Sequence, residues 1–267
     1  MLNILCALHC EAKPLIQHLR LRKLQESAPF PVYENEAMRL AVCGIGKIAA
    51  ATATGWLGAR ENTCSAWLNI GVAGHADLPI GYQALALSVT DAGSSKRFYP
   101  DISLIKGLPM HGVTTVDKPS FSYPDKDLVD MEAAGFYQAA QRFATVDRIH
   151  CLKIVSDNAW HPTEKINKEF VRDLIGQSIT KIESLIGQIL ALIPNPPAID
   201  DSPYVALCHW TETEKHQLER LLIRWKAMEK SPPLCQHLKT SREIIQFLEH
   251  TLNQLPLCFT PSTTKKK

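Results

Sequence analysis

Short, continuous apolar runs alternate with longer amphipathic stretches over the first 190 residues. Continuous apolar runs are typical of strands that are buried on both faces of a sheet. They predict strands at residues 2–8, 38–43, 66–70, 84–89, 112–116 and 150–155. Helical spacing of apolar positions predicts helices at residues 11–22, 48–61, 128–143 and 163–192. This alternation predicts an α/β domain with a mixed, mostly parallel central sheet flanked by helices.

The pattern changes after residue 192. Four prolines within residues 193–203 cannot continue a helix and predict a linker. Beyond it, residues 211–229 and 241–253 each carry a row of apolar side chains on one helical face. We therefore predict a domain over residues 1–192 and a C-terminal helical hairpin within residues 204–267, which ends in a disordered basic tail.

The composition is that of an ordinary globular protein, with 45% apolar residues, 21% charged residues and a net charge of +2. Nothing here favours nucleic acid or a membrane as a partner, and no run approaches the roughly 18 apolar residues that span a bilayer. The N-terminal run lacks a basic leader and is cut short by Glu11, so we expect a buried strand and no signal peptide. Eight scattered cysteines without a CxxC pair indicate a reduced, cytoplasmic protein without a zinc site.

Three segments place carboxylates at the end of a predicted strand or the start of a helix: Glu11, the Asp130–Glu132 pair and Asp157. Ligands of open α/β sheets collect at the carboxyl ends of strands. Each acid also has a simpler explanation. Glu11 suits the first turn of a helix, Asp130 an N-cap, and Asp157 a turn.

Glycines follow two of the predicted strands, at Gly44 and Gly46 and at Gly71 and Gly74. Glycine permits positive φ and close approach of the backbone to a ligand. A nucleotide P-loop is excluded because the Gly-Ile-Gly-Lys segment lacks the GxxxxGK[ST] spacing. For the first pair, a plain turn and a ligand contact remain open alternatives, whereas we expect the second pair to contact a ligand.

These motifs together resemble one family. The order of Glu11, Gly-Ile-Gly-Lys at 44–47, Asn-Ile-Gly-Val-Ala-Gly at 69–74, Asp-Met-Glu-Ala-Ala at 130–134 and Ser-Asp at 156–157 is similar to that of methylthioadenosine/S-adenosylhomocysteine nucleosidases and their purine nucleoside phosphorylase relatives. The resemblance spans about residues 2–190. It implies a nucleoside phosphorylase-like fold, a small nucleoside as the binding partner, and a homodimer or larger homo-oligomer.

The resemblance also implies roles for individual residues in cleaving the N-glycosidic bond of an adenosine-derived nucleoside. Asp157 would protonate or hydrogen-bond the purine at N7, with Ser156 positioning it. Glu132 would bind ribose hydroxyls, Met131 would pack against the sugar, and Glu11 would activate the attacking water. No metal or organic cofactor is implied. We expect all three acids to surround one cavity.

The chain departs from the family pattern at several positions. Val72 stands where the family has a serine, and His75 replaces a small residue, either as a substrate contact or as a loop residue. Phe121 is the candidate for stacking on the base. Glu11 stands where phosphorylases of the family have a phosphate loop, and Arg60 is the only arginine between residues 40 and 95. This favours hydrolysis, with a phosphate-dependent phosphorylase or a non-catalytic nucleoside-binding module as alternatives.

Overall fold

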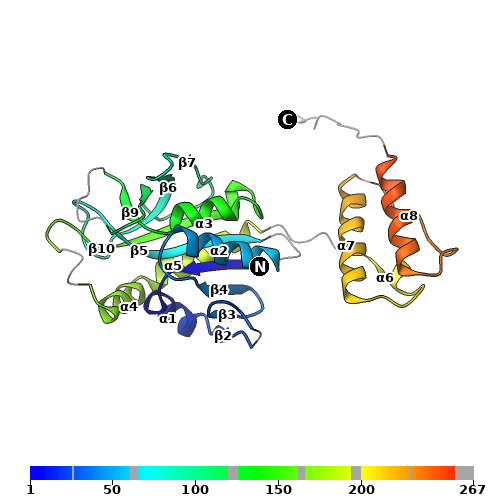
Figure 1. The fold of residues 1–267 in the computed structure, drawn as a ribbon, viewed down its shortest axis with the longest axis horizontal. Coiled ribbons are helices and arrows are strands. Elements are labelled where there is room, and N and C mark those ends of the chain that lie inside the picture. The colour runs from blue at the N-terminus through cyan, green and yellow to red at the C-terminus, as the bar shows by residue number, and fades with distance from the viewer. Residues whose placement is uncertain are drawn as a thin grey trace, which may run out of the picture. The chain divides into compact units, whose positions relative to one another are not determined.

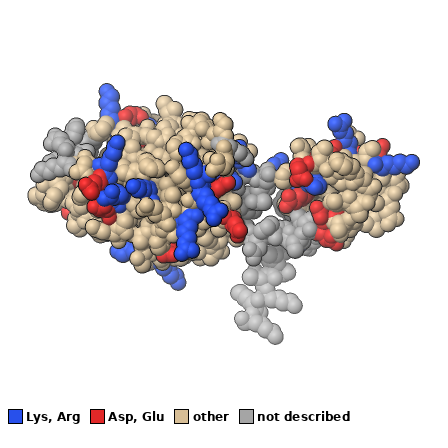
Figure 2. All heavy atoms as spheres, turned by 90° about the horizontal axis from the view of Figure 1, so that it is seen from below, with Lys and Arg blue, Asp and Glu red and all other residues tan. Residues whose placement is uncertain are grey.

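The computed structural model describes residues 1–25, 27–60, 65–119, 126–161, 166–193, 200–228 and 230–255. The chain forms two compact units, Met1–Pro194 and Asn195–Lys267, which are described separately (Figure 1). In the ranges just given, no helix is both long and apolar enough to cross a membrane. Basic and acidic side chains are interspersed on the face that Figure 2 shows.

The first unit is built on one mixed sheet, which has ten strands in the described part of the chain. Five of its strands form a closed circuit. β5 pairs with β10 on one side and with β9 on the other, and β6 and β8 connect β10 to β9. β1 and β4 extend the sheet from β5 in parallel, followed by antiparallel β3 and β2. The bounds are β1 Leu2–Cys6, β2 Arg22–Lys23, β3 Val32–Glu34, β4 Met38–Val42, β5 Ala66–Gly74, β6 Gln83–Asp91, β7 Arg97–Phe98, β8 Met110–Thr115, β9 Leu128–Asp130 and β10 Ile149–Asp157.

Helices cover both faces of this sheet (Figure 1). On one face pack α1 (His9–His18), α4 (Lys168–Gln177) and α5 (Ile179–Ala191), and on the other pack α2 (Lys47–Ala59) and α3 (Ala133–Ala140). Alternate residues of the central strands enter the two cores, as period-two geometry requires. This explains why those strands are continuously apolar in the sequence. The prediction of an α/β fold with a mixed, helix-flanked sheet is confirmed.

Two element predictions are wrong. The helix predicted at residues 128–143 begins as strand β9, whose residues pair with β8, and becomes helical only at Ala133. The helix predicted at residues 163–192 is two helices in its described part, separated at Ser178. The Ser178 hydroxyl donates to the carbonyl oxygen of Leu174, at 2.9 Å, where the first helix ends.

The second unit contains α6 (Ser202–Val205), α7 (Glu212–Ala227) and α8 (Ser241–Asn253). Both longer helices begin with a reciprocal capping box, Thr211 with Glu214 and Thr240 with Glu243, which satisfies two N–H groups at each helix start. This unit has a core of its own, formed by Tyr204, Trp210, Leu218, Leu221, Leu222, Trp225, Cys235, Ile244, Leu248 and Leu252. The linker bounds and the basic tail stay predictions, since residues 194–199 and 256–267 lie outside the described ranges.

Candidate active site

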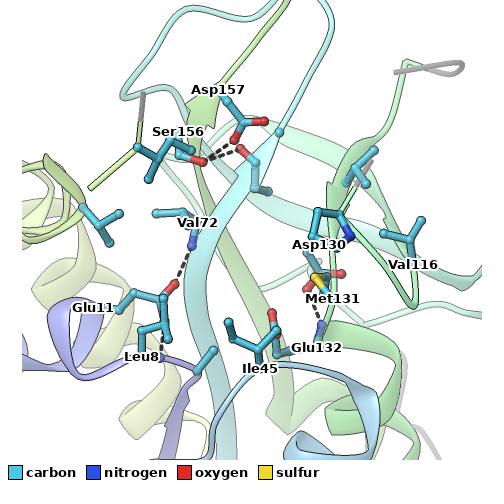
Figure 3. Close-up of a pocket in the computed structure, with 17 residues that line it drawn as sticks. Leu8, Glu11, Ile45, Val72, Val116, Asp130, Met131, Glu132, Ser156 and Asp157 are labelled. Carbon is cyan, nitrogen blue, oxygen red and sulfur yellow. Dashed lines mark hydrogen bonds between the residues drawn. The ribbon is translucent and has the colours of Figure 1, made fainter. Parts of the chain in front are cut away.

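A cavity of about 330 Å³ opens where β5, β9 and β10 end and where α1 begins (Figure 3). Its volume lies at the lower end of the range for small-ligand sites. The strand ends are held in register by Gly74, which pairs with Asp157 of β10 and with Val129 of β9. The described residues that line the cavity are Ala7, Leu8, Glu11, Ile45, Val72, Ala73, Gly74, Val116, Pro119, Val129, Asp130, Met131, Glu132, Ser156, Asp157, Ile166 and Val171.

Glu11 lies in the first turn of α1 and is only 2% exposed. One carboxylate oxygen accepts from the backbone N–H of Leu8 at 2.8 Å, and the other accepts from the N–H of Val72 at 3.0 Å. Burial raises the pKa of Glu11 above its ordinary value, while these two N–H groups and Lys153 oppose the shift. Glu11 therefore caps its helix and also presents a buried carboxylate to the cavity.

Glu132 faces the same cavity from the start of α3 and accepts from the backbone N–H of Gly46 at 2.8 Å. Burial raises the pKa of Glu132 to about 7. The positive charge of Lys153 lowers it, and the negative charge of Asp130 raises it further. The neutral form of this carboxyl is therefore favoured far more at neutral pH than that of an exposed glutamate. Met131, the residue before it, also lines the cavity.

Asp157 ends β10 and is 6% exposed. The Ser156 hydroxyl donates to the Asp157 carboxylate at 2.6 Å, and it also approaches the carbonyl oxygen of Ala73 at 3.4 Å (Figure 3). A β-bulge between Val155 and Asp157 shifts the register at this point. Bulges redirect side chains, and here two consecutive residues, Ser156 and Asp157, both line the cavity.

The glycine segments have distinct places in the structure. Gly44 and Gly46 adopt φ of 88° and 103°, so they form the turn into α2, and Ile45 between them lines the cavity. Gly74 also lines the cavity. Gly71 lies behind Glu11 instead, because a Cβ at this position would be 3.0 Å from Glu11 Oε1. Its lack of a side chain therefore leaves room for the Glu11 carboxylate.

The structure places His75 outside the set of described residues that line the cavity. Its Nδ1 accepts from the backbone N–H groups of Asp77 and Leu78, each at 3.0 Å, so Nε2 carries the proton and donates to the carbonyl oxygen of Lys126. Of the two alternatives, the loop residue is the one that this geometry supports. Phe121 lies outside the described residues.

Beneath the cavity lies an ion pair that the sequence analysis did not predict. Lys153 Nζ is 2.7 Å from Asp130 Oδ2, and both side chains are at most 1% exposed. The Asp130 carboxylate also accepts from Thr115 Oγ1 at 2.6 Å and from the N–H of Ala133 at 2.8 Å. Burial lowers the pKa of Lys153, but the negative charges of Asp130 and Glu132 outweigh burial and raise it above its ordinary value. The one available signal was a lysine inside an otherwise apolar strand.

The cavity is therefore mostly apolar and is lined by four acidic residues, Glu11, Asp130, Glu132 and Asp157, of which Asp130 is paired with Lys153. Neither arginine nor lysine is among the described residues that line it. In those same residues, no group of three or more histidine, cysteine or acidic side chains could hold a metal ion. The arrangement can accept hydrogen bonds from hydroxyl groups and can exchange protons with a neutral ligand.

Over about 70% of its length the chain shares its fold with solved nucleosidases and a futalosine hydrolase. A methylthioadenosine/S-adenosylhomocysteine nucleosidase from Campylobacter jejuni superimposes with a TM-score of 0.57 at 19% identity, over 69% of this chain and 97% of that one. A methylthioadenosine nucleosidase from Arabidopsis thaliana gives 0.61 at 17% identity, over 70% and 95% of the two chains. A futalosine hydrolase mutant from Helicobacter pylori gives 0.55 at 16% identity, over 70% and 98%.

At these identities the likeness establishes the fold. No protein-family model matches the chain, and no curated protein is significantly similar to it in sequence.

Proposed function

We propose that this protein is a purine nucleosidase that hydrolyses the N-glycosidic bond of an adenosine-derived nucleoside to free base and sugar. The observation that carries the proposal is that Glu11, Glu132 and Asp157, which come from three separate elements, line one cavity of about 330 Å³. Cleavage of this bond passes through a positively charged, oxocarbenium-like sugar, which buried carboxylates stabilise. The nucleosidase fold supports the proposal independently.

Glu11 is the proposed general base. In the reaction, a water oxygen bonds to the anomeric carbon while the carbon–nitrogen bond to the base breaks, and the water gives up a proton. A carboxylate whose pKa is raised by burial accepts that proton more readily than an exposed one. The N–H groups of Leu8 and Val72 hold its two oxygens in place without displacing it from the cavity.

Asp157 is the proposed proton donor or hydrogen-bond partner for N7 of the departing purine. The hydrogen bond from Ser156, at 2.6 Å, fixes the orientation of its carboxyl group. Glu132 is the proposed acceptor for the ribose hydroxyls, with Met131 packing against the sugar. In this assignment two acids handle protons at opposite ends of the reacting bond, and the third binds the sugar between them.

Water is favoured over phosphate as the nucleophile. Phosphate binding relies on arginine side chains or clustered backbone N–H groups. No cationic side chain is among the described residues that line the cavity, Lys153 beneath it is paired with Asp130, and the N–H groups of Leu8 and Val72 already donate to Glu11. A phosphorylase would also have to accommodate an anion beside the four acidic residues that line the cavity.

The proposal is tested by incubating the purified protein with a panel of adenine nucleosides, with and without phosphate, and assaying free base. We expect base release that does not require phosphate. Release that depends on phosphate would instead identify a phosphorylase. Tight binding of a nucleoside without release of base would identify a binding module.

The same assay tests the proposed catalytic groups. Glu11→Gln and Asp157→Asn should each lower kcat by about 10²–10⁴-fold, the usual contribution of one proton-transferring group. Both substitutions keep the size of the side chain, so nucleoside affinity should change much less than kcat. Asp173→Asn, at an exposed position on α4, is the control and should leave kcat unchanged. Full activity in either site variant would contradict the assignment.

A further inference from the structure

Lys47, the first residue of α2, joins three segments of the chain at the edge of the cavity. Its ammonium group lies 2.5 Å from Asp91 Oδ1 at the end of β6 and 2.8 Å from Asp117 Oδ1, in the segment that follows β8. The side chains of Lys47 and Asp91 are 18% and 16% exposed, so this contact is only partly screened by solvent.

The backbone of Lys47 is closely packed against α3. A Cβ at Gly135 would overlap the Lys47 carbonyl group, so α3 approaches the start of α2 as closely as backbone atoms permit. The preceding residue, Gly46, donates its N–H to Glu132 at 2.8 Å. Lys47 therefore lies at a fixed position relative to the start of α3, where Glu132, the proposed ribose-binding residue, is located.

The segment that Lys47 holds through Asp117 forms one wall of the cavity. Val116 and Pro119, on either side of the Asp117–Lys118 pair, both line it. The N–H of Val116 donates to the carbonyl oxygen of Asp130 at 2.8 Å. This bond anchors the segment at its start, and the contact between Asp117 and Lys47 anchors it one residue further along.

We propose that Lys47 is a positioning residue of the nucleoside site, which holds the Val116–Pro119 wall at a fixed distance from Glu132 by bridging Asp91 and Asp117. The proposal rests on the proposed function, because it takes the cavity to be the nucleoside site. Lys47 is not among the described residues that line the cavity, so it acts through the wall and not on the substrate.

Two carboxylates share one ammonium group in this bridge, so removing the lysine and removing one aspartate should have different effects. Asp91 and Asp117 both direct an oxygen at one ammonium group, so without Lys47 two carboxylates would face each other with no cation between them. Hydrogen bonds with Asp117 and Asp91 raise the pKa of Lys47 above its ordinary value, so the bridge stays charged at neutral pH. The Asp117 side chain is 66% exposed, so water screens part of its charge, and loss of the lysine replaces attraction with a modest repulsion that loosens the wall.

The test is steady-state kinetics on Lys47→Met, Lys47→Arg and the double variant Lys47→Met/Asp117→Asn. We expect Lys47→Met to raise KM about fivefold with kcat little changed, which corresponds to about 1 kcal/mol for a partly exposed ion pair. Lys47→Arg should restore KM. Adding Asp117→Asn to Lys47→Met should lower KM again, because it removes the repulsion. Lys181→Met, at an exposed position on α5, is the matched control.

Hydrogen exchange of the backbone amides of residues 116–118 separates failure of this proposal from failure of the proposed function, because it needs no substrate. Lys47→Met should exchange about fivefold faster there and Lys47→Arg should not. Unchanged exchange in Lys47→Met, or a double variant no better than Lys47→Met, would overturn the positioning role. If the wild-type protein cleaves no nucleoside, the proposed function fails, and the exchange data alone decide whether the bridge holds this segment.

Discussion

The acids of the cavity differ in how their burial is compensated. Asp130 is paired with Lys153 and receives several hydrogen bonds, whereas Glu132 receives one backbone N–H and lies beside that pair. The pKa of Glu132 is accordingly raised to about 7. Burying a carboxyl so that its pKa is raised toward 7 lowers the stability of the folded protein, and such perturbed groups are typical of functional sites.

This cost can be measured through the pH dependence of stability. Between the ordinary pKa of 4.5 and the folded value of about 7, the folded protein binds more protons at Glu132 than the unfolded chain does. Stability due to this group is therefore present at low pH and is lost as pH rises through 7. We expect Glu132→Gln to be more stable than the wild type at pH 8, by on the order of 3 kcal/mol, and equally stable near pH 4. Urea unfolding at both pH values checks this, and an equal difference at both would contradict it.

The Lys153–Asp130 pair gives a second prediction at this scale. Lys153→Met leaves Asp130 as a buried, uncompensated charge and should reduce the free energy of unfolding by about 3–5 kcal/mol. The double variant Lys153→Met/Asp130→Asn should recover a large part of that loss, because no charge is then left unpaired. Denaturant unfolding measures both variants. A double variant less stable than Lys153→Met would show that the ion pair is not the source of the effect.

Position after a strand or at the start of a helix made each acid of the cavity a candidate, but each also suited a turn or a helix start. The order of the motifs, which resembles one family, is what predicted a shared site. The lysine that pairs with Asp130 was missed. Lys153 lies in the middle of an apolar strand, where nothing in the sequence says which side chain it will meet. Asp130 was open to interpretation as an N-cap, and it does accept from the first N–H groups of α3. His75 could not be assigned because its partner, the Lys126 carbonyl, is 51 residues away.

At the scale of elements, the long central strands were predictable because both of their faces are buried. Strands β2, β3 and β7 have two or three residues each, too few to show any periodicity. β9 was absorbed into a predicted helix because its three residues run directly into the apolar start of α3. Residues 128–130 form a strand because they pair with β8 and β5, and such tertiary contacts cannot be read from the local sequence.

The close contact between α2 and α3 allows the packing between elements to be tested. Gly135→Ala would drive a methyl group into the Lys47 carbonyl and should destabilise the protein by about 1–3 kcal/mol. Gly187→Ala is the matched control, because a Cβ added to this exposed glycine of α5 would meet no atom within 4 Å, and it should gain about 0.5–1 kcal/mol. Thermal unfolding of both variants checks the prediction. Similar effects in the two would mean that the helices do not approach this closely.

At the scale of the whole molecule, the solved nucleosidases match about 70% of this chain over nearly their full length. The first unit holds every described residue around the cavity, and the second unit has a separate core. Self-association stays a prediction.

A chain that ends at Pro194 should therefore fold and, if the proposed nucleosidase activity is correct, should retain its kcat/KM within about twofold, as expected of a domain with its own core. Circular dichroism and the base-release assay applied to the truncated and full-length proteins test this. Loss of activity in a truncated chain that remains folded would give the second unit a direct part in catalysis.

The residues that line the cavity belong either to the closed circuit of β5, β10, β6, β8 and β9 and the helices that begin beside it, or to connecting segments. Gly74 pairs with strands on both sides, so the spacing between the acids of β10 and the start of α3 is set by backbone hydrogen bonds. Ile45, Val116 and Ile166, by contrast, belong to connecting segments. Exchange of these three side chains should therefore change which ligands the cavity admits while the backbone pairing that spaces the acids stays in place.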